Sequence, residues 1–137
     1  MQDFQICYPN VTLELLVTER RVDLIEDGID VALRIGDRKD DHAITVKLGE
    51  YRHLLVSSPI LLEEYGEPSH PQDLIKLPCA SWGVSTQSKI WLLGHKTIQI
   101  NPLLQVNDYL HLLELALAGR CATELPPFLA QSPILDG

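Results

Sequence analysis

The sequence predicts an α/β fold, and residues 11–33 are the main reason. Apolar side chains alternate with their neighbours over 11–17, which is the period of a β-strand. Val22, Ile25 and Ile29 then fall on one helical face, and 31–33 is a continuous apolar run of the kind found in strands covered on both sides. A strand, a helix and a strand with short connections favour a parallel, right-handed crossover unit.

Breakers and caps delimit the elements of the first third of the chain. Residues 1–8 are predicted to be the end of a helix, which Pro9-Asn10 terminates. Gly28 stands where a glycine would end the helix that begins at Glu19. The polar stretch 34–42 is predicted to be a loop.

Two further strands are predicted at 43–48 and 53–57, separated by Gly49-Glu50. Ser58-Pro59 then provides the N-cap serine and first-turn proline of a helix. That helix is expected to run to about Tyr65 and to end at Gly66.

The remaining residues alternate short apolar runs with turn signals. A helical turn is predicted at 73–76, strands at 79–82, 90–93, 97–100, 104–106 and 121–125, a densely apolar helix at 109–118, and a last short helix that Pro126-Pro127 opens.

Composition excludes several classes of protein. The 137 residues carry a net charge of −8, and no basic cluster is longer than Arg20-Arg21, which argues against DNA binding by this segment alone. The three cysteines are far apart without CxxC spacing, which fits a reducing cytoplasm. The N-terminus has no signal-peptide pattern, and no run of about 20 apolar residues predicts a membrane span.

Motifs for catalysis and metal binding are absent from the sequence. There is no G-x-S-x-G, no phosphate-binding loop and no HExxH, and the five histidines lack ligand spacing. The carboxylates are spread along the chain as solvated charge. We therefore predict no enzymatic activity, no catalytic or metal-binding residue and no cofactor.

Ten short pieces of the chain, in order, resemble the effector-binding domain of LysR-type bacterial transcriptional regulators. They are Tyr8-Pro9-x-Val11, Val22-Asp-Leu24, Gly28-x-Asp30-Val-Ala32, Arg34-x-Gly36, Leu48-Gly49, Leu55-Val-Ser-Ser-Pro59, Pro71-x-Asp-Leu74, Asn107-Asp108, Ala118-Gly119 and Leu125-Pro126. The chain departs from the pattern at Cys121 and Glu124, where the family usually has glycine and an apolar residue. Glu124 either faces solvent or weakens its strand.

The resemblance implies a two-lobed, periplasmic-binding-protein-like (type II) α/β fold, in which each lobe is a mixed sheet flanked by helices. Lobe I would cover residues 1–56 and lobe II residues 57–137, with the effector in the cleft between them. On the family's pattern the first strand of lobe I, and the segments that follow residue 137, are expected to be missing, so that lobe I is truncated.

Candidate ligand contacts in lobe I lie at the carboxyl ends of its predicted strands, where open parallel sheets bind ligands. The resemblance implies an effector contact at or next to Thr18; the alternative is N-capping of the helix that follows. Arg34 and Gly36 end the next strand. Arg34 either binds a ligand carboxylate or forms an ion pair with Asp37 or Asp40.

Candidate contacts in lobe II are Ser57, Ser81, Trp82 and Asn107. Ser57 flanks the expected hinge, next to the predicted cap Ser58. Ser81 and Trp82 end a predicted strand, and Trp82 is either an aromatic wall of the cleft or a core residue. Asn107 is either the N-cap of the apolar helix or a donor to the ligand.

The resemblance implies a cytoplasmic, homodimeric regulator that senses a small metabolite, most often a carboxylate. DNA would be bound by a helix-turn-helix that residues 1–137 do not contain. The 11–17 strand and the helix after Pro59 are candidate interface pieces. Two alternatives stay open: a solute-binding protein of a transporter, which requires an export signal, and a truncated paralogue that binds full-length regulators.

Overall fold

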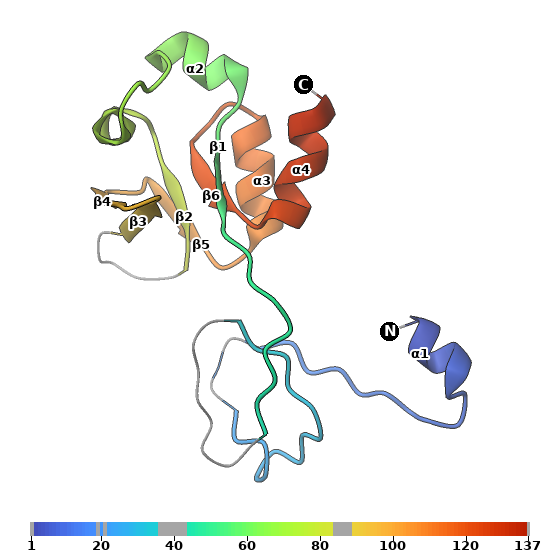
Figure 1. Ribbon diagram of the computed structural model, residues 1–137. Helices are drawn as coiled ribbons and strands as arrows, with labels where there is room; N and C mark the ends of the chain where they lie inside the picture. Colours follow the sequence, from blue (N-terminus) through green and yellow to red (C-terminus); the bar gives the residue numbers. More distant parts are fainter. Residues whose placement is uncertain (1, 19, 21, 36–43, 84–88, 137) are drawn as a thin grey trace. The chain divides into compact units, whose positions relative to one another are not determined.

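A computed structural model describes residues 2–18, 20, 22–35, 44–83 and 89–136 of the chain. The chain divides into two compact units, Met1–Lys47 and Leu48–Gly137, which are described one at a time. Secondary structure is concentrated in the second unit (Figure 1). The predicted lobe boundary at residues 56 and 57 stays a prediction.

In Met1–Lys47, the described residues form one regular element, the helix α1 (Gln2–Cys7). The strands predicted at 11–17 and 31–33 are absent from the structure, as are residues 44–47 of the predicted 43–48 strand. A period of two shows that a segment suits a sheet, but a strand forms only when its backbone pairs with a neighbour. The apolar side chains are accordingly exposed, with 86% of Val17 and 86% of Val31 open to solvent.

The helix predicted from Glu19 to Gly28 is described at residues 20 and 22–28, which form a single turn. The Asp23 side chain accepts hydrogen bonds from the backbone N–H groups of Ile25 (2.9 Å) and Glu26 (3.1 Å), as a capping carboxylate does. Gly28, at φ 65°, closes the turn, and its N–H donates to the Ile25 carbonyl at 3.3 Å. The glycine therefore ends a turn, as its position predicted, but the described residues 20 and 22–27 before it form no helix.

The unit Leu48–Gly137 is organised around a small sheet. β2 (Ala80–Trp82) pairs in parallel with β5 (Leu104–Val106), and β1 (Leu54–Val56) pairs antiparallel with β6 (Thr123–Leu125). A parallel bridge between Cys79 and Ala122 places β6 beside β2. The strand order is therefore β5, β2, β6, β1.

Both faces of this sheet are covered. The helices α3 (Tyr109–Leu117) and α4 (Pro127–Asp136) lie on one side (Figure 1). The other side holds the antiparallel hairpin β3 (Lys89–Leu93) and β4 (Lys96–Ile100), with α2 (Pro59–Tyr65) and the 3-10 helix η1 (Pro71–Lys76).

Each side of the sheet has its own hydrophobic core. The α3 side holds Ala80, Leu112, Cys121, Leu125 and Ala130, and the hairpin side holds Leu61, Leu74, Leu77, Cys79, Trp91, Ile98, Ile100 and Ala122. Cys79 and Ala80 belong to opposite cores, as do Cys121 and Ala122, because side chains alternate along an extended chain. The continuous apolar runs in the sequence reflect this double burial.

The elements predicted in this unit are confirmed to within two residues at each end. Ser58 caps α2 as predicted, since its side chain accepts a hydrogen bond from the Leu61 N–H at 3.3 Å, and Gly66 at φ 84° ends that helix. Gly119, at φ 70°, follows α3. These signals are local, which is why the sequence alone was enough to predict them.

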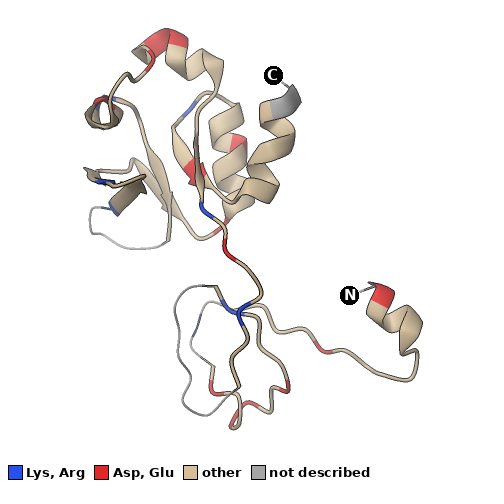
Figure 2. Cartoon of the chain, viewed as in Figure 1, with Lys and Arg blue, Asp and Glu red and all other residues tan. Residues whose placement is uncertain are grey.

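Charge is dispersed over the described residues. Figure 2 shows Lys and Arg standing singly rather than gathered on one element. Among those residues no helix is long and apolar enough to cross a membrane, and no group of three or more His, Cys, Asp or Glu side chains has an arrangement that could hold a metal ion.

The three thiols are expected to differ in reactivity. Cys7 is exposed, whereas Cys79 and Cys121 are buried. Burial, reinforced by Cys121, raises the pKa of Cys79 to about 11, so the reactive thiolate is scarce at neutral pH. With a chromogenic disulfide reagent at pH 7.5, we expect one thiol per chain to react rapidly in the native protein and all three in urea. A second rapid thiol in the native protein would contradict the burial.

Candidate functional site

The carboxyl ends of β2, β5 and β6 meet at one edge of the sheet, because the bridge and the ladder run in parallel. At this edge Gly83 follows β2, α3 begins shortly after β5, and Pro126 follows β6. Open α/β sheets bind ligands at the carboxyl ends of their strands. This edge of the sheet, the carboxyl edge, is therefore the candidate site.

Four rings form a continuous row at the carboxyl edge. Trp82 stacks on Tyr109, with ring centroids 5.8 Å apart and planes inclined by 18°. Tyr109 lies 5.4 Å from the His53 ring, and its hydroxyl is 3.1 Å from His53 Nε2. Tyr51 meets His53 edge-on at 5.5 Å. We call Tyr51, His53, Tyr109 and Trp82 the aromatic row.

The structure supports the core alternative for Trp82 in part. Its side chain is half-buried and packs against the core on the α3 side, as does Tyr109. Both residues are partly exposed. Trp82 is thus partly a core residue, and its role as an aromatic wall of the ligand cleft stays a prediction.

Burial and charge set the protonation of two groups here. Burial first, then the charges of Glu124 and Tyr51, raises the pKa of Tyr109 to about 12, so its hydroxyl keeps its proton at neutral pH. Burial also raises the pKa of Glu124, although His53 and Lys89 act in the opposite direction. Glu124 is half-buried, so it does not simply face solvent.

Ser81 is buried at 1% exposure and lies on the sheet face opposite Trp82, since neighbouring residues of a strand point to opposite sides. Ser57 lies elsewhere. It is half-buried, and its hydroxyl donates a long, 3.5 Å hydrogen bond to the Ser58 carbonyl. The two serines therefore do not converge on one point of the carboxyl edge.

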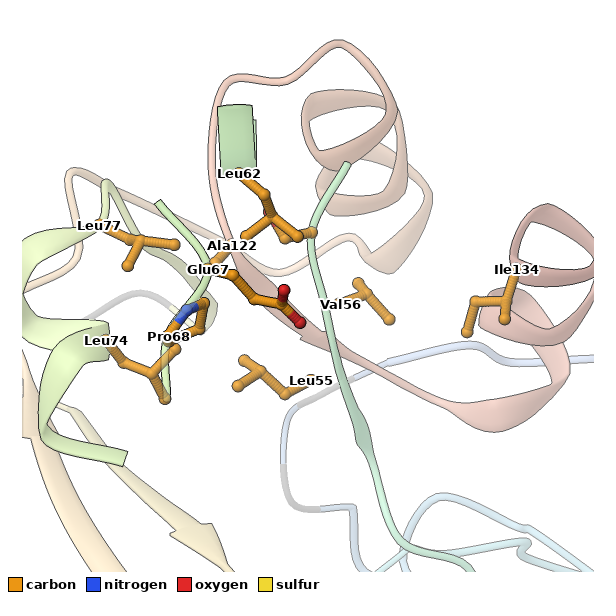
Figure 3. A pocket seen from close by; sticks show the side chains of 10 residues that line it. Leu55, Val56, Leu62, Glu67, Pro68, Leu74, Leu77, Ala122 and Ile134 are labelled. Carbon is orange, nitrogen blue, oxygen red and sulfur yellow. The ribbon is translucent and has the colours of Figure 1, made fainter. Parts of the chain in front are cut away.

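Ser57 lines a hollow of about 310 Å³ beside β1 and α2 (Figure 3). The other lining residues are Leu55, Val56, Leu62, Glu67, Pro68, Leu74, Leu77, Ala122 and Ile134. Ser57 is the one predicted site residue among them. Because its lining is mainly aliphatic, the hollow offers few groups that would orient a polar ligand.

The prediction that Asn107 is the N-cap of α3 is wrong by one residue. Asp108 is the cap, and its carboxylate accepts a hydrogen bond from the Leu110 N–H at 2.9 Å. Asn107 is exposed immediately before it. Asn and Asp are equally good caps, so the sequence Asn107-Asp108 could not separate them. The alternative, that Asn107 donates to a ligand, stays a prediction.

Because Asp108 and not Asn107 caps α3, alanine substitutions at these two residues are expected to differ in their effect on stability. Asp108→Ala is expected to lower the free energy of unfolding by about 1 kcal/mol, because it removes the helix cap. Asn107→Ala is expected to change it by less than about 0.5 kcal/mol, as an exposed substitution does. Urea denaturation followed by circular dichroism measures both. Equal losses for the two variants would contradict the assignment of the cap.

In Met1–Lys47, Thr18 caps a turn rather than a helix. Its hydroxyl accepts a hydrogen bond from the Arg20 N–H at 3.2 Å. Arg34 is partly buried, and its Nη2 donates to the Val22 carbonyl at 3.1 Å, which ties two segments of this unit together. The predicted site residue Gly36, and the proposed ion-pair partners Asp37 and Asp40, lie outside the described residues.

Sequence reasoning missed most of the carboxyl edge. His53 is one of the five histidines whose spacing indicated no ligand role, and Tyr109 and Tyr51 were not singled out. His53 and Tyr109 are 56 positions apart, so no local spacing relates them. The one available signal was Glu124, a carboxylate in a strand where the family usually has an apolar residue.

Comparison with known proteins gives a consistent result. A family model described as the LysR substrate binding domain matches residues 1–137. The chain is 39% identical over 72 residues, 53% of its length and 24% of the relative, to the HTH-type transcriptional regulator DmlR of Escherichia coli K12. It is 27% identical over 139 residues, 94% of the chain and 45% of the relative, to the HTH-type transcriptional activator TtdR of the same strain.

Among solved structures, CrgA, a LysR-type transcriptional regulator from Neisseria meningitidis, matches with a TM-score of 0.84 and 27% identity. The match covers 99% of this chain and 47% of CrgA. The chain thus spans less than half the length of each of these three proteins. The similarity in structure confirms the predicted periplasmic-binding-protein-like α/β fold.

Proposed function

The chain belongs to the LysR substrate-binding domain family, and from that premise we propose that it senses a small metabolite for a transcriptional regulator. The observation that carries the proposal is the carboxyl edge, where the stacked rings of Trp82 and Tyr109 lie at the ends of parallel strands. This arrangement suits reversible binding of a small molecule. The transcriptional regulators among the relatives support a non-enzymatic role.

We propose that the effector is a carboxylate. Thr18 offers a hydroxyl, and Arg34 offers a guanidinium that can bind a carboxylate in a bidentate manner. With Gly36 they are the proposed contacts in Met1–Lys47, and Ser57, Ser81, Trp82 and Asn107 are those in Leu48–Gly137. Trp82 has the strongest support, because it belongs to the aromatic row.

We also propose that the domain acts in the cytoplasm as a homodimer, with DNA contacted by a helix-turn-helix of a longer protein. The relatives whose names specify an HTH-type regulator are more than twice as long as this chain. Their names favour this role over that of a transporter's solute-binding protein. The net charge of −8 agrees with placing DNA recognition elsewhere. A monomer in light scattering at all concentrations would contradict the dimer.

A thermal-shift panel of small carboxylates, aromatic acids and amino acids tests the proposal. A ligand at 100 times its Kd is expected to stabilise the native state by about 2.7 kcal/mol. The shift is expected to disappear in Thr18→Val and to persist in Thr97→Val, a matched change at an exposed residue of β4. If no carboxylate raises the melting temperature, the proposed function is wrong.

A further inference from the structure

The chain enters Leu48–Gly137 through a short stretch without regular structure. Residues 48–53 belong to no helix or strand, and β1 begins at Leu54. Leu48 is 79% exposed. An added Cβ at Gly49 would meet no atom of the described residues within 4 Å, so its backbone is not enclosed by them. The first two residues of the stretch therefore have room to change their backbone conformation.

The last residues of the same stretch are held by the aromatic row. The His53 ring lies 5.4 Å from the Tyr109 ring, and His53 Nε2 is 3.1 Å from the Tyr109 hydroxyl. Tyr51 packs edge-on against His53 at 5.5 Å. Tyr109 stacks on Trp82, and both pack against the core on the α3 side. Ring contacts and a hydrogen bond thus connect Tyr51 and His53 to that core, although both residues are exposed.

The residues that follow His53 are held by the sheet. Leu54, Leu55 and Val56 each have a partner in β6, so a bend within β1 would break this pairing. Ser58 caps α2 directly afterwards, and a change of direction at Ser57 would disturb that cap. A hinge next to Ser57, as the sequence predicted, would therefore have to break existing contacts.

We propose that the connection between the two units bends at Leu48-Gly49, and that the aromatic row is the anchor that ends this pivot. All four residues of the row belong to Leu48–Gly137. A movement of Met1–Lys47 about the pivot would therefore leave the carboxyl edge intact. The inference concerns the free protein and does not depend on which effector binds, or on whether one does.

Backbone order parameters from nitrogen-15 relaxation, measured on the chain without added ligand, test the position of the pivot. Flexible backbone has an order parameter below about 0.6 and rigid backbone one of about 0.85. We expect the low value at Leu48 and Gly49 and the high value from Tyr51 to Val56. Rigid backbone at Leu48 and Gly49 would overturn the pivot, and so would a minimum at residues 54–57. Flexible backbone as far as His53 would overturn the anchor.

His53→Ala is the decisive variant, with His111→Ala as its control. Both remove an exposed imidazole, but His111 lies on α3 outside the aromatic row. His53→Ala is expected to lower the order parameters of residues 51–53 below about 0.6, and to leave β1 near 0.85 because its pairing with β6 remains. His111→Ala is expected to leave the profile unchanged. Residues 51–53 that stay rigid in His53→Ala would overturn the anchor.

Tyr109→Phe reaches the same contact from its other side. It keeps the ring of Tyr109 and removes only the hydroxyl, which lies 3.1 Å from His53 Nε2. Residues 51–53 are expected to lose order, but less than in His53→Ala, because the ring contacts remain. A profile identical to that of the parent chain would overturn the part of the hydrogen bond in the anchor. Unchanged amide resonances in β2, β5 and β6 show in the same spectra that each variant is folded.

Discussion

Replacing Leu112 by alanine is expected to lower the free energy of unfolding of Leu48–Gly137 by about 2–5 kcal/mol. Leu112 is fully buried at the centre of the core on the α3 side, with an exposed fraction of 0%. The substitution loses the apolar burial of the side chain and leaves a cavity that the sheet and two helices cannot fill by a local movement. Because domains are stable by only about 5–15 kcal/mol, this is a large share of the total.

Leu117→Ala is the matched control for this prediction. It makes the same chemical change on the same helix, but Leu117 is 54% exposed. Its effect is expected to stay within about 1 kcal/mol, since little packing is lost. Urea denaturation followed by tryptophan fluorescence measures both variants, because Trp82 and Trp91 lie in this unit. Similar losses for the two variants would mean that α3 does not bury the Leu112 face against the sheet.

The contrast between the two units explains how much of the fold could be predicted. In Leu48–Gly137 the sequence signals are local: Ser58 and Pro59 start α2, Gly66 ends it, and Gly119 follows α3. Each acts through backbone geometry within a few residues, so no knowledge of tertiary contacts is needed. The alternation of buried residues in the strands then follows from the two cores.

In Met1–Lys47 the same kind of pattern led to wrong predictions. The 11–17 segment has the alternation of a strand, yet Leu15 is 65% exposed and Val17 86% exposed. The alternation records which residues suit a sheet, whereas a strand also requires a neighbour for its hydrogen bonds. That neighbour is a property of the whole fold. Periodicity within residues 11–17 therefore could not show whether the segment forms a strand.

The candidate site was predictable only in part for a related reason. Trp82, which belongs to the aromatic row, was singled out because ligand positions in parallel sheets follow strand ends, and strand ends can be predicted locally. His53 and Tyr109 come together only through the order of strands β5, β2, β6 and β1. Asn107 was misassigned as a cap because its neighbour Asp108 is chemically equivalent in that role.

Gly119→Ala is expected to destabilise Leu48–Gly137 by about 2–4 kcal/mol, the second large effect that we predict. Gly119 has φ 70°, which costs an L-residue roughly 1–2 kcal/mol by itself. An added Cβ would also lie 3.1 Å from Ile60 Cγ2 and 3.2 Å from Ser58 Oγ. Ile60 is 62% exposed and can move outward, but Ser58 is buried and its hydroxyl caps α2. Displacing that hydroxyl would weaken the cap by about 1 kcal/mol.

Gly94→Ala separates the backbone contribution from the steric one. Gly94, in the turn between β3 and β4, has a closely similar φ of 64°, and an added Cβ there meets nothing within 4 Å. It is expected to lose only the backbone part, roughly 1–2 kcal/mol. The difference between the two losses in unfolding free energy, measured by urea denaturation, is therefore the steric cost of packing a side chain at residue 119 against Ser58 and Ile60. Equal losses would mean that Ser58 and Ile60 yield freely, and that the cap on α2 does not depend on the absence of a side chain at residue 119.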